Sequence, residues 1–177
     1  RVRRQRQMCI RDSTKTDVLK FTTEVQPIGK QQYMELSKDI FVFSYLCGGI
    51  NFTDIANLTK ENIQNGRLHY IRQKTKKLIK IGIPQEAMQI IEKYSKESKG
   101  YLFPILDSHT HRTALQKQNR IHKILGKVNK NLKLLAADLG VEANLTTYVA
   151  RHSFASVLKK SGVNICLLYT SDAADEL

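Results

Sequence analysis

The stretch "RLHYIRQKTKKLIKIGI" at residues 67–83 decides the fold class of this chain, because its apolar residues recur at alternate positions. A spacing of two is typical of a β-strand with one buried face. The alternating residues are Leu68, Tyr70, Ile79, Ile81 and Ile83. Asn65–Gly66 marks a turn before this stretch, and Pro84 ends it. The sequence therefore predicts an antiparallel hairpin with a basic tip at Lys74–Lys77.

A strongly apolar helix is predicted before the hairpin. Residues 31–47 become apolar on nearly all sides after Asp39, which indicates a helix buried in the centre of a domain. Gly48 and Gly49 end this helix, because glycine readily leaves the helical conformation.

Three short segments lie around the hairpin. Residues 52–63 predict one or two helical turns, with Thr53 or Asp54 as the capping residue. Residues 85–98 predict an amphipathic helix, and residues 101–106 a short extended piece. The inward face of that helix is expected to carry Ala87, Ile90, Ile91 and Tyr94.

The longest helical pattern covers residues 113–136. Its apolar stripe consists of Ile121, Ile124, Leu125, Val128, Leu132 and Leu135. We expect Arg120, Lys123, Lys127 and Lys130 on the opposite side. Such a basic stripe can line a DNA phosphate backbone, although an ordinary solvated face explains it equally well.

A last helix is predicted at residues 147–161. Its inward stripe is Ala150, Phe154, Val157, Leu158 and Ser161. The sequence thus predicts a mainly α fold with one small antiparallel β-hairpin or sheet, an α+β arrangement.

The two ends differ in pattern from the rest. Residues 1–13 and 166–177 resemble translated sequencing-adapter sequence, and we expect both to be non-native tails. The remaining 14–165 are expected to form one domain that is incomplete at its C-terminus.

Composition favours a polyanionic partner inside the cell. The net charge is +13, and positive charge favours nucleic acid, although a solvated lysine-rich surface is the alternative. The three cysteines, Cys9, Cys47 and Cys166, have no paired spacing, which fits a reduced cytoplasmic protein without disulfides or a zinc site. No run of residues reads as a membrane span or a secretory signal.

The stretch "TTYVARHSFASVLKKSG" at residues 146–162 contains a candidate phosphate ligand. Arg151 lies at the edge of the apolar stripe, with Tyr148 three residues earlier on the same side. A guanidinium held there by packing can bind a phosphate through two hydrogen bonds. A surface salt bridge is the alternative when the arginine is considered alone.

Three motifs in this order resemble the catalytic domain of the tyrosine recombinases, the phage-integrase family, and especially integrases of mobile elements in Bacteroides-like bacteria. They are "GGINFTDIANL", "RQKTKK" and, most specific, "YVARHSFASVLKKSGV". The resemblance covers roughly residues 30–165. It implies cleavage of one DNA strand at a time through a 3′-phosphotyrosyl intermediate, without metal or other cofactor, by an oligomer bound to double-stranded attachment-site DNA.

The resemblance also implies residue roles. Arg151 matches the second arginine of the family's His-x-x-Arg motif, and Lys74 matches the hairpin lysine that protonates the leaving 5′-oxygen. Lys76 and Lys77 either substitute for Lys74 or bind the DNA backbone. His152 follows the arginine as a packing or orienting residue.

Three departures from the family pattern bear on activity. Asn51 stands where the family usually has its first arginine, so it can donate a hydrogen bond but carries no charge. Tyr148 stands at the motif histidine, and a phenol is a poor base near neutral pH. The family's nucleophilic tyrosine follows the second arginine by roughly thirty residues. Here Tyr169, 18 residues after Arg151 and inside the predicted tail, is not expected to serve.

We therefore expect this chain to bind DNA without cleaving it, although the parent protein would be a recombinase. Two alternatives stay open. One is a non-catalytic DNA-binding remnant or regulator that uses the same surface. The other is a helical protein-interaction domain whose lysines only maintain solubility.

Overall fold

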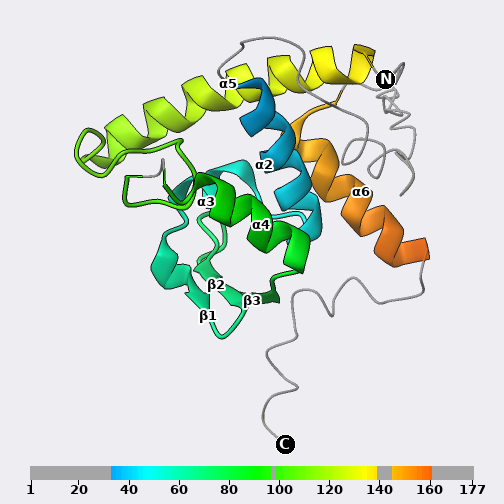
Figure 1. Ribbon diagram of the computed structural model, residues 1–177, viewed down its shortest axis with the longest axis horizontal. Helices are drawn as coiled ribbons and strands as arrows, with labels where there is room; N and C mark the ends of the chain where they lie inside the picture. Colours follow the sequence, from blue (N-terminus) through cyan, green and yellow to red (C-terminus); the bar gives the residue numbers. More distant parts are fainter. Residues whose placement is uncertain (1–32, 97–98, 139–144, 161–177) are drawn as a thin grey trace, which may run out of the picture.

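The computed structural model describes residues 33–96, 99–138 and 145–160 (Figure 1). Its elements in chain order are α2 (Met34–Leu46), α3 (Phe52–Asn57), a 3₁₀ turn (Lys60–Asn62), β1 (Ile63–Gln64), β2 (Arg67–Ile71), β3 (Leu78–Gly82), α4 (Gln85–Tyr94), α5 (Ala114–Asp138) and α6 (Thr147–Lys160). The predicted α+β class is confirmed. The predicted terminal tails lie outside the described residues, and the boundaries at 14 and 165 stay a prediction.

Helix α2 is the centre of the fold. In Figure 1 the long helix α5 lies on one side of α2, and the small sheet and α4 lie on the opposite side. Helix α6 runs beside α2. Ile40 and Phe43 are fully buried, as the apolar pattern predicted. Phe43 packs edge-on against Phe103 with ring centroids 5.0 Å apart. Segment 101–106, predicted to be extended, instead forms bends and a turn, because its apolar side chains fold into this core.

The predicted hairpin is present, and a third strand extends it. Strands β2 and β3 are antiparallel, with Tyr70 opposite Ile79. The short strand β1 pairs with β2 through a two-residue turn at Asn65 and Gly66. Both turn residues have positive φ angles, 51° and 72°, which is the conformation that an Asn-Gly hairpin turn requires. The sheet order is therefore β1-β2-β3.

The cap predicted for the first short helix is wrong. Helix α3 begins at Phe52 with Asn51 at the N-cap position, so Thr53 and Asp54 lie inside its first turn. Asp54 is buried and accepts a hydrogen bond from another element, as described below. The carboxylate therefore joins two segments of the chain and does not cap its own helix.

The apolar stripes predicted for helices α4, α5 and α6 are buried or half-buried where side chains are described. Ala87, Ile91 and Tyr94 of α4 are buried, and this helix ends at Tyr94, four residues before the predicted end. Ala150 of α6 is fully buried, and Phe154 stacks edge-on against Tyr45. The predictions for Val157, Leu158 and Ser161 fall outside the described side chains.

Candidate active site

A glycine turn brings the start of α6 against the end of α2. Gly48 and Gly49 have φ angles of 73° and 72°, which other residues adopt only with strain. A Cβ atom on Gly49 would lie 2.9 Å from the Cα of Arg151. The Arg151 Nη1 atom donates a hydrogen bond of 3.4 Å to the carbonyl oxygen of Gly49. Arg151 is thus packed directly on the turn that leads to Asn51.

The first residue of α6 is held by the long helix. The backbone N–H of Thr147 donates to Oδ1 of Asn129 on α5, at 3.0 Å. This bond satisfies one of the N–H groups that a helix start leaves without a partner inside the helix. The N-terminal turn that carries Arg151 is therefore fixed on two sides, by α5 and by the glycine turn.

The basic hairpin tip is tied to α3. The backbone N–H of Gln73 donates a 2.9 Å hydrogen bond to Oδ1 of Asp54. Within the tip, the Arg72 N–H donates to the Lys77 carbonyl oxygen at 2.9 Å, and the Lys76 N–H donates to the Arg72 carbonyl oxygen at 2.8 Å. Lys74 lies in the exposed middle of this closed turn. Its backbone is therefore fixed one residue away from the Asp54 contact.

The electrostatic environment of Asp54 shows that the two segments converge. Burial raises the pKa of the Asp54 carboxyl above its ordinary value. The Gln73 hydrogen bond and three cations, Arg72, Arg151 and Lys76, lower this pKa and oppose the effect of burial. A charged group changes the pKa of another group appreciably only when the two lie close together. Arg151 of α6 and two hairpin cations, Arg72 and Lys76, therefore act on the same carboxylate.

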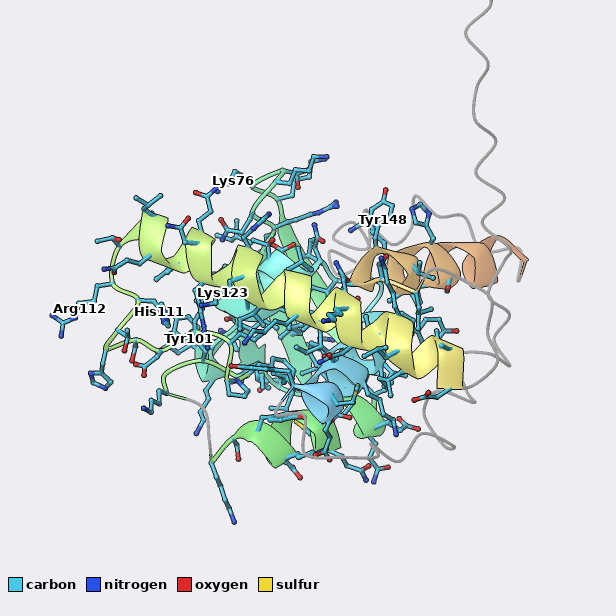
Figure 2. The ribbon with its side chains drawn as sticks, turned by 90° about the horizontal axis from the view of Figure 1, so that it is seen from above. Lys76, Tyr101, His111, Arg112, Lys123 and Tyr148 are labelled. Carbon is cyan, nitrogen blue, oxygen red and sulfur yellow. The ribbon has the colours of Figure 1, made fainter. Side chains whose placement is uncertain are left out.

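The two residues that replace expected charged groups are accessible. Asn51 is exposed at the start of α3, and its side chain makes no capping hydrogen bond. Tyr148 is 61% exposed, and its ring meets His152 edge-on with centroids 4.3 Å apart. Figure 2 shows Tyr148 and Lys76 projecting toward the same side of the molecule. The side chains of Tyr148 and Lys76 are thus presented on a common face.

The basic residues of α5 divide into two groups. Lys123, Lys127 and Lys130 are exposed, and Lys127 lies 4.7 Å from the ring centroid of Tyr33. Arg120 was expected on the same outer face, but its guanidinium turns inward. Its Nε donates to the Ile105 carbonyl oxygen at 3.1 Å, and its Nη2 contacts the Tyr33 hydroxyl at 3.5 Å. At about 100° per residue, Arg120 lies next to the buried stripe and so reaches these acceptors.

Sequence reasoning missed three residues that build this site. Gly49 was assigned only a helix-ending role, Asp54 was assigned a capping role, and Arg72 was not singled out. The alternation of β2 contained a usable signal for Arg72. Arg72 follows Leu68 and Tyr70 at the same spacing of two residues, and those two side chains face inward, with 0% and 7% exposure. No local pattern indicated the contact between Asp54 and the hairpin.

Other chemistries find less support among the described residues. Cys47 is fully buried, and burial raises the pKa of its thiol to about 12, so it is not a reactive thiolate. The described part of the chain contains no group of three or more His, Cys, Asp or Glu residues arranged to hold a metal ion. In the His109–His111 loop, Nδ1 of His111 accepts a hydrogen bond from the Asp107 N–H at 3.0 Å. None of the described helices is both long and apolar enough to cross a membrane.

Comparison with known proteins identifies the family. The model of the phage integrase family matches residues 15–169, which is most of the chain. The chain therefore belongs to the phage integrase family. A search of the curated proteins found no significant match.

Solved structures agree in fold. The Tn1549 transposon integrase in complex with transposon right end DNA superposes with a TM-score of 0.58 at 16% identity. The same integrase in complex with a circular intermediate DNA gives 0.55 at 20% identity. Both alignments cover 88% of this chain and 55% of the other. XerA recombinase gives 0.51 at 14% identity, over 81% of this chain and 55% of that one. The chain thus spans about half the length of these structures, and the likeness shows a shared fold.

Proposed function

We propose that this chain is catalytic-domain sequence of a site-specific DNA recombinase from a mobile genetic element. The observation that carries the proposal is that the hairpin tip bonds Asp54 through the Gln73 N–H, while Arg151 packs on Gly49, so both segments meet the short stretch 49–54. These segments are far apart in the sequence, and the fold brings both against the same short stretch of chain. A DNA phosphodiester is the ligand that this arrangement fits best.

The proposed reaction is phosphoryl transfer without hydrolysis. A tyrosine attacks the scissile phosphate, forms a 3′-phosphotyrosyl bond and releases the 5′-oxygen, which Lys74 protonates. Arg151 stabilises the negative charge that gathers on the non-bridging oxygens. Asn51 and Tyr148 donate hydrogen bonds to the same phosphate, and His152 orients Tyr148 through their ring contact. The proposal assigns the nucleophile to none of the described residues and requires neither a metal nor another cofactor.

The surrounding DNA is proposed to lie along the exposed lysines of the tip and of α5. These are Lys76, Lys77, Lys123, Lys127 and Lys130. In this proposal the inward-facing Arg120 supports the helix and does not contact DNA directly. The intact protein would assemble as an oligomer on double-stranded attachment sites in the bacterial cytoplasm.

DNA binding is tested with the chain itself. Fluorescence anisotropy with a labelled duplex, repeated at several salt concentrations, should show affinity falling steeply as salt rises, because each neutralised phosphate releases condensed counterions. Binding that does not depend on salt, or no binding to duplex DNA, would instead favour a helical protein-interaction domain.

Catalysis is tested with the protein encoded by the intact gene and the ends of its element. Arg151→Ala should reduce covalent complex formation by about 10²–10³-fold while leaving most DNA affinity. Arg67→Ala is the matched control, because Arg67 is exposed at the opposite end of β2 from the tip. Equal activity of the Arg151 variant and the control would refute the assignment of Arg151.

The role of Lys74 has its own test. A substrate in which sulfur replaces the leaving 5′-oxygen releases a thiolate, which needs no protonation near neutral pH. Lys74→Ala should therefore be slow on the oxygen substrate and close to wild type on the sulfur substrate. A variant that is equally slow on both would show that Lys74 is not the general acid.

A non-catalytic DNA-binding module is the second candidate. The uncharged Asn51 at the position of an expected arginine favours it. This candidate predicts salt-dependent DNA binding by the intact gene product, with no covalent protein–DNA complex under any condition.

A further inference from the structure

We propose that a groove beside the hairpin tip binds one unpaired nucleobase, the base of the nucleotide that carries the 5′-hydroxyl after strand cleavage. This inference rests on the proposed recombinase function and deepens it. When DNA ends are exchanged, that nucleotide leaves its old partner before it pairs with a new one. The groove holds its base during this step and thereby favours exchange over rejoining of the original strand.

The groove lies between α3, the hairpin tip and the first half of α5, and its volume is about 470 Å³. Proteins bind small organic ligands in cavities of about 300–1,000 Å³, so a nucleobase is small enough to enter. Gln73 lines the groove, and the next residue, Lys74, is the proposed general acid for the leaving 5′-oxygen. The nucleotide attached to that oxygen is therefore the one whose base lies nearest to the groove.

Hydrogen bonds hold the walls of the groove in place. The Gln73 N–H donates to Oδ1 of Asp54 at 2.9 Å, which joins the tip to α3. On α3 itself, Nδ2 of Asn57 donates to the Thr53 carbonyl oxygen at 2.7 Å. A site whose walls are already ordered loses less conformational freedom when a ligand binds. The groove is therefore suited to capture a base that is exposed only briefly.

The lining of the groove matches a base better than a phosphate. Asn57, Gln73 and Gln118 provide amides, and His122 adds an imidazole. Lys117 is the single lysine or arginine among the lining residues. Phosphate sites in proteins rely on charged donors, often arginine. Amides instead carry both donors and acceptors, as the edges of nucleobases do.

Gln118 and His122 are the residues best placed to contact the base. They are four positions apart on α5, hence on one face of the helix, and both are exposed. Ile121 and Leu125 line the same groove and supply its apolar surface. Ile121 is only 8% exposed, so it is anchored in the core. An unpaired base can thus place its flat face on the apolar residues while its edge meets the polar ones.

The test uses the intact gene product and a duplex of its element that is nicked at the scissile position. The first nucleotide after the nick carries a 5′-hydroxyl and 2-aminopurine, whose fluorescence rises when it leaves the base stack. Binding of the wild-type protein should raise this fluorescence. A double variant, Gln118→Leu with His122→Leu, should show a smaller rise. It should also bind the nicked duplex at least about tenfold more weakly, the loss expected for two hydrogen bonds, with unchanged affinity for a continuous duplex.

Two controls separate the base from the rest of the DNA. Gln89→Leu is the matched variant, because Gln89 is also an exposed glutamine within a helix, on α4, and it should change neither affinity. An abasic nucleotide after the nick removes the base but keeps the sugar and phosphate. On that substrate the double variant should bind as well as wild type. Circular dichroism and thermal unfolding of each variant verify that the fold is intact.

The outcomes distinguish this inference from the proposed function. If the double variant weakens binding to nicked, continuous and abasic duplexes equally, the two side chains contact paired DNA or its backbone. The inference then fails and the function stands. If the double variant binds every substrate as wild type does, the groove holds no base, and again only the inference fails. If the wild-type protein forms no covalent complex with any DNA of its element, both the function and the inference fail.

Discussion

Replacing Gly49 by alanine should damage the site through a single steric contact. The new Cβ would lie 2.9 Å from the Cα, 3.0 Å from the Cγ and 3.2 Å from the Cβ of Arg151. The closest of these atoms is backbone, so it cannot rotate away. To reach an ordinary contact of 3.4 Å, the start of α6 has to move by about 0.5 Å. Arg151 is displaced with it.

Gly48→Ala is a matched control for this change. Gly48 has almost the same φ angle, 73° against 72°, so both variants carry a similar backbone strain. A Cβ on Gly48 would meet only the side chains of Ile81 and Phe154, at 3.5 Å and more, which is ordinary contact. The strain of a left-handed non-glycine residue costs about 1–2 kcal/mol. Both variants should lose that much unfolding free energy, and Gly49→Ala should lose more.

The activities should differ more than the stabilities. A displacement of about 1 Å in a catalytic group can cost about 10²-fold in rate, so a shift of half that size should cost about tenfold. We expect this loss for Gly49→Ala and little loss for Gly48→Ala, measured as covalent complex formation by the intact gene product. Urea unfolding of each variant gives the stability in parallel. Equal rates for the two variants, with Gly49→Ala folded, would refute the argument that this contact positions Arg151.

Three further predictions concern other parts of the structure. Lys123→Ala should reduce the salt dependence of DNA binding by about one phosphate contact, with little change in stability. Arg120→Met should instead reduce the unfolding free energy by about 1–2 kcal/mol and leave the salt dependence of DNA binding unchanged. Burial raises the pKa of Asp54, so its contribution to stability is fully present below pH 3.8 and is lost as pH rises through the folded-state pKa. In urea titrations, wild type should therefore lose stability relative to Asp54→Asn as pH rises from about 3.8. Lys93 is paired with the buried Asp39 at 2.6 Å, and the pKa of its ammonium group is raised. Lys93→Met should therefore reduce the unfolding free energy by about 1 kcal/mol after solvent screening. This loss should be constant at neutral pH and decline above pH 10.5.

The elements were predictable because periodicity reports burial. The alternation around Tyr70 and the apolar stripe that begins at Ile121 each depend on one face meeting the core, and both appear as predicted. The prediction for segment 101–106 was wrong because this segment has no periodicity from which regular structure could be predicted. It is apolar throughout and buried without regular structure, and a short apolar run does not separate a strand from an irregular core segment.

The site was predictable only in part, because its contacts join segments that no local pattern connects. Arg151 was identified as a candidate phosphate ligand from its place beside the apolar stripe, but its catalytic role and that of Lys74 came from resemblance to a family. The roles of Asp54 and Gly49 depend on partners 19 and 102 residues away. Arg120 shows the same limit at short range, since its place beside the stripe was visible but its carbonyl acceptor on another segment was not.

The contacts that hold this site together also suggest how its catalytic set could change during evolution. Backbone atoms make the decisive joins, between Gly49 and Arg151 and between the Gln73 N–H and Asp54. Neither join uses the side chain at position 51. An uncharged residue could therefore replace an arginine there without loosening the frame, provided that another cation reached the same phosphate. The frame that positions Arg151 and the hairpin tip therefore does not depend on the side chain at position 51.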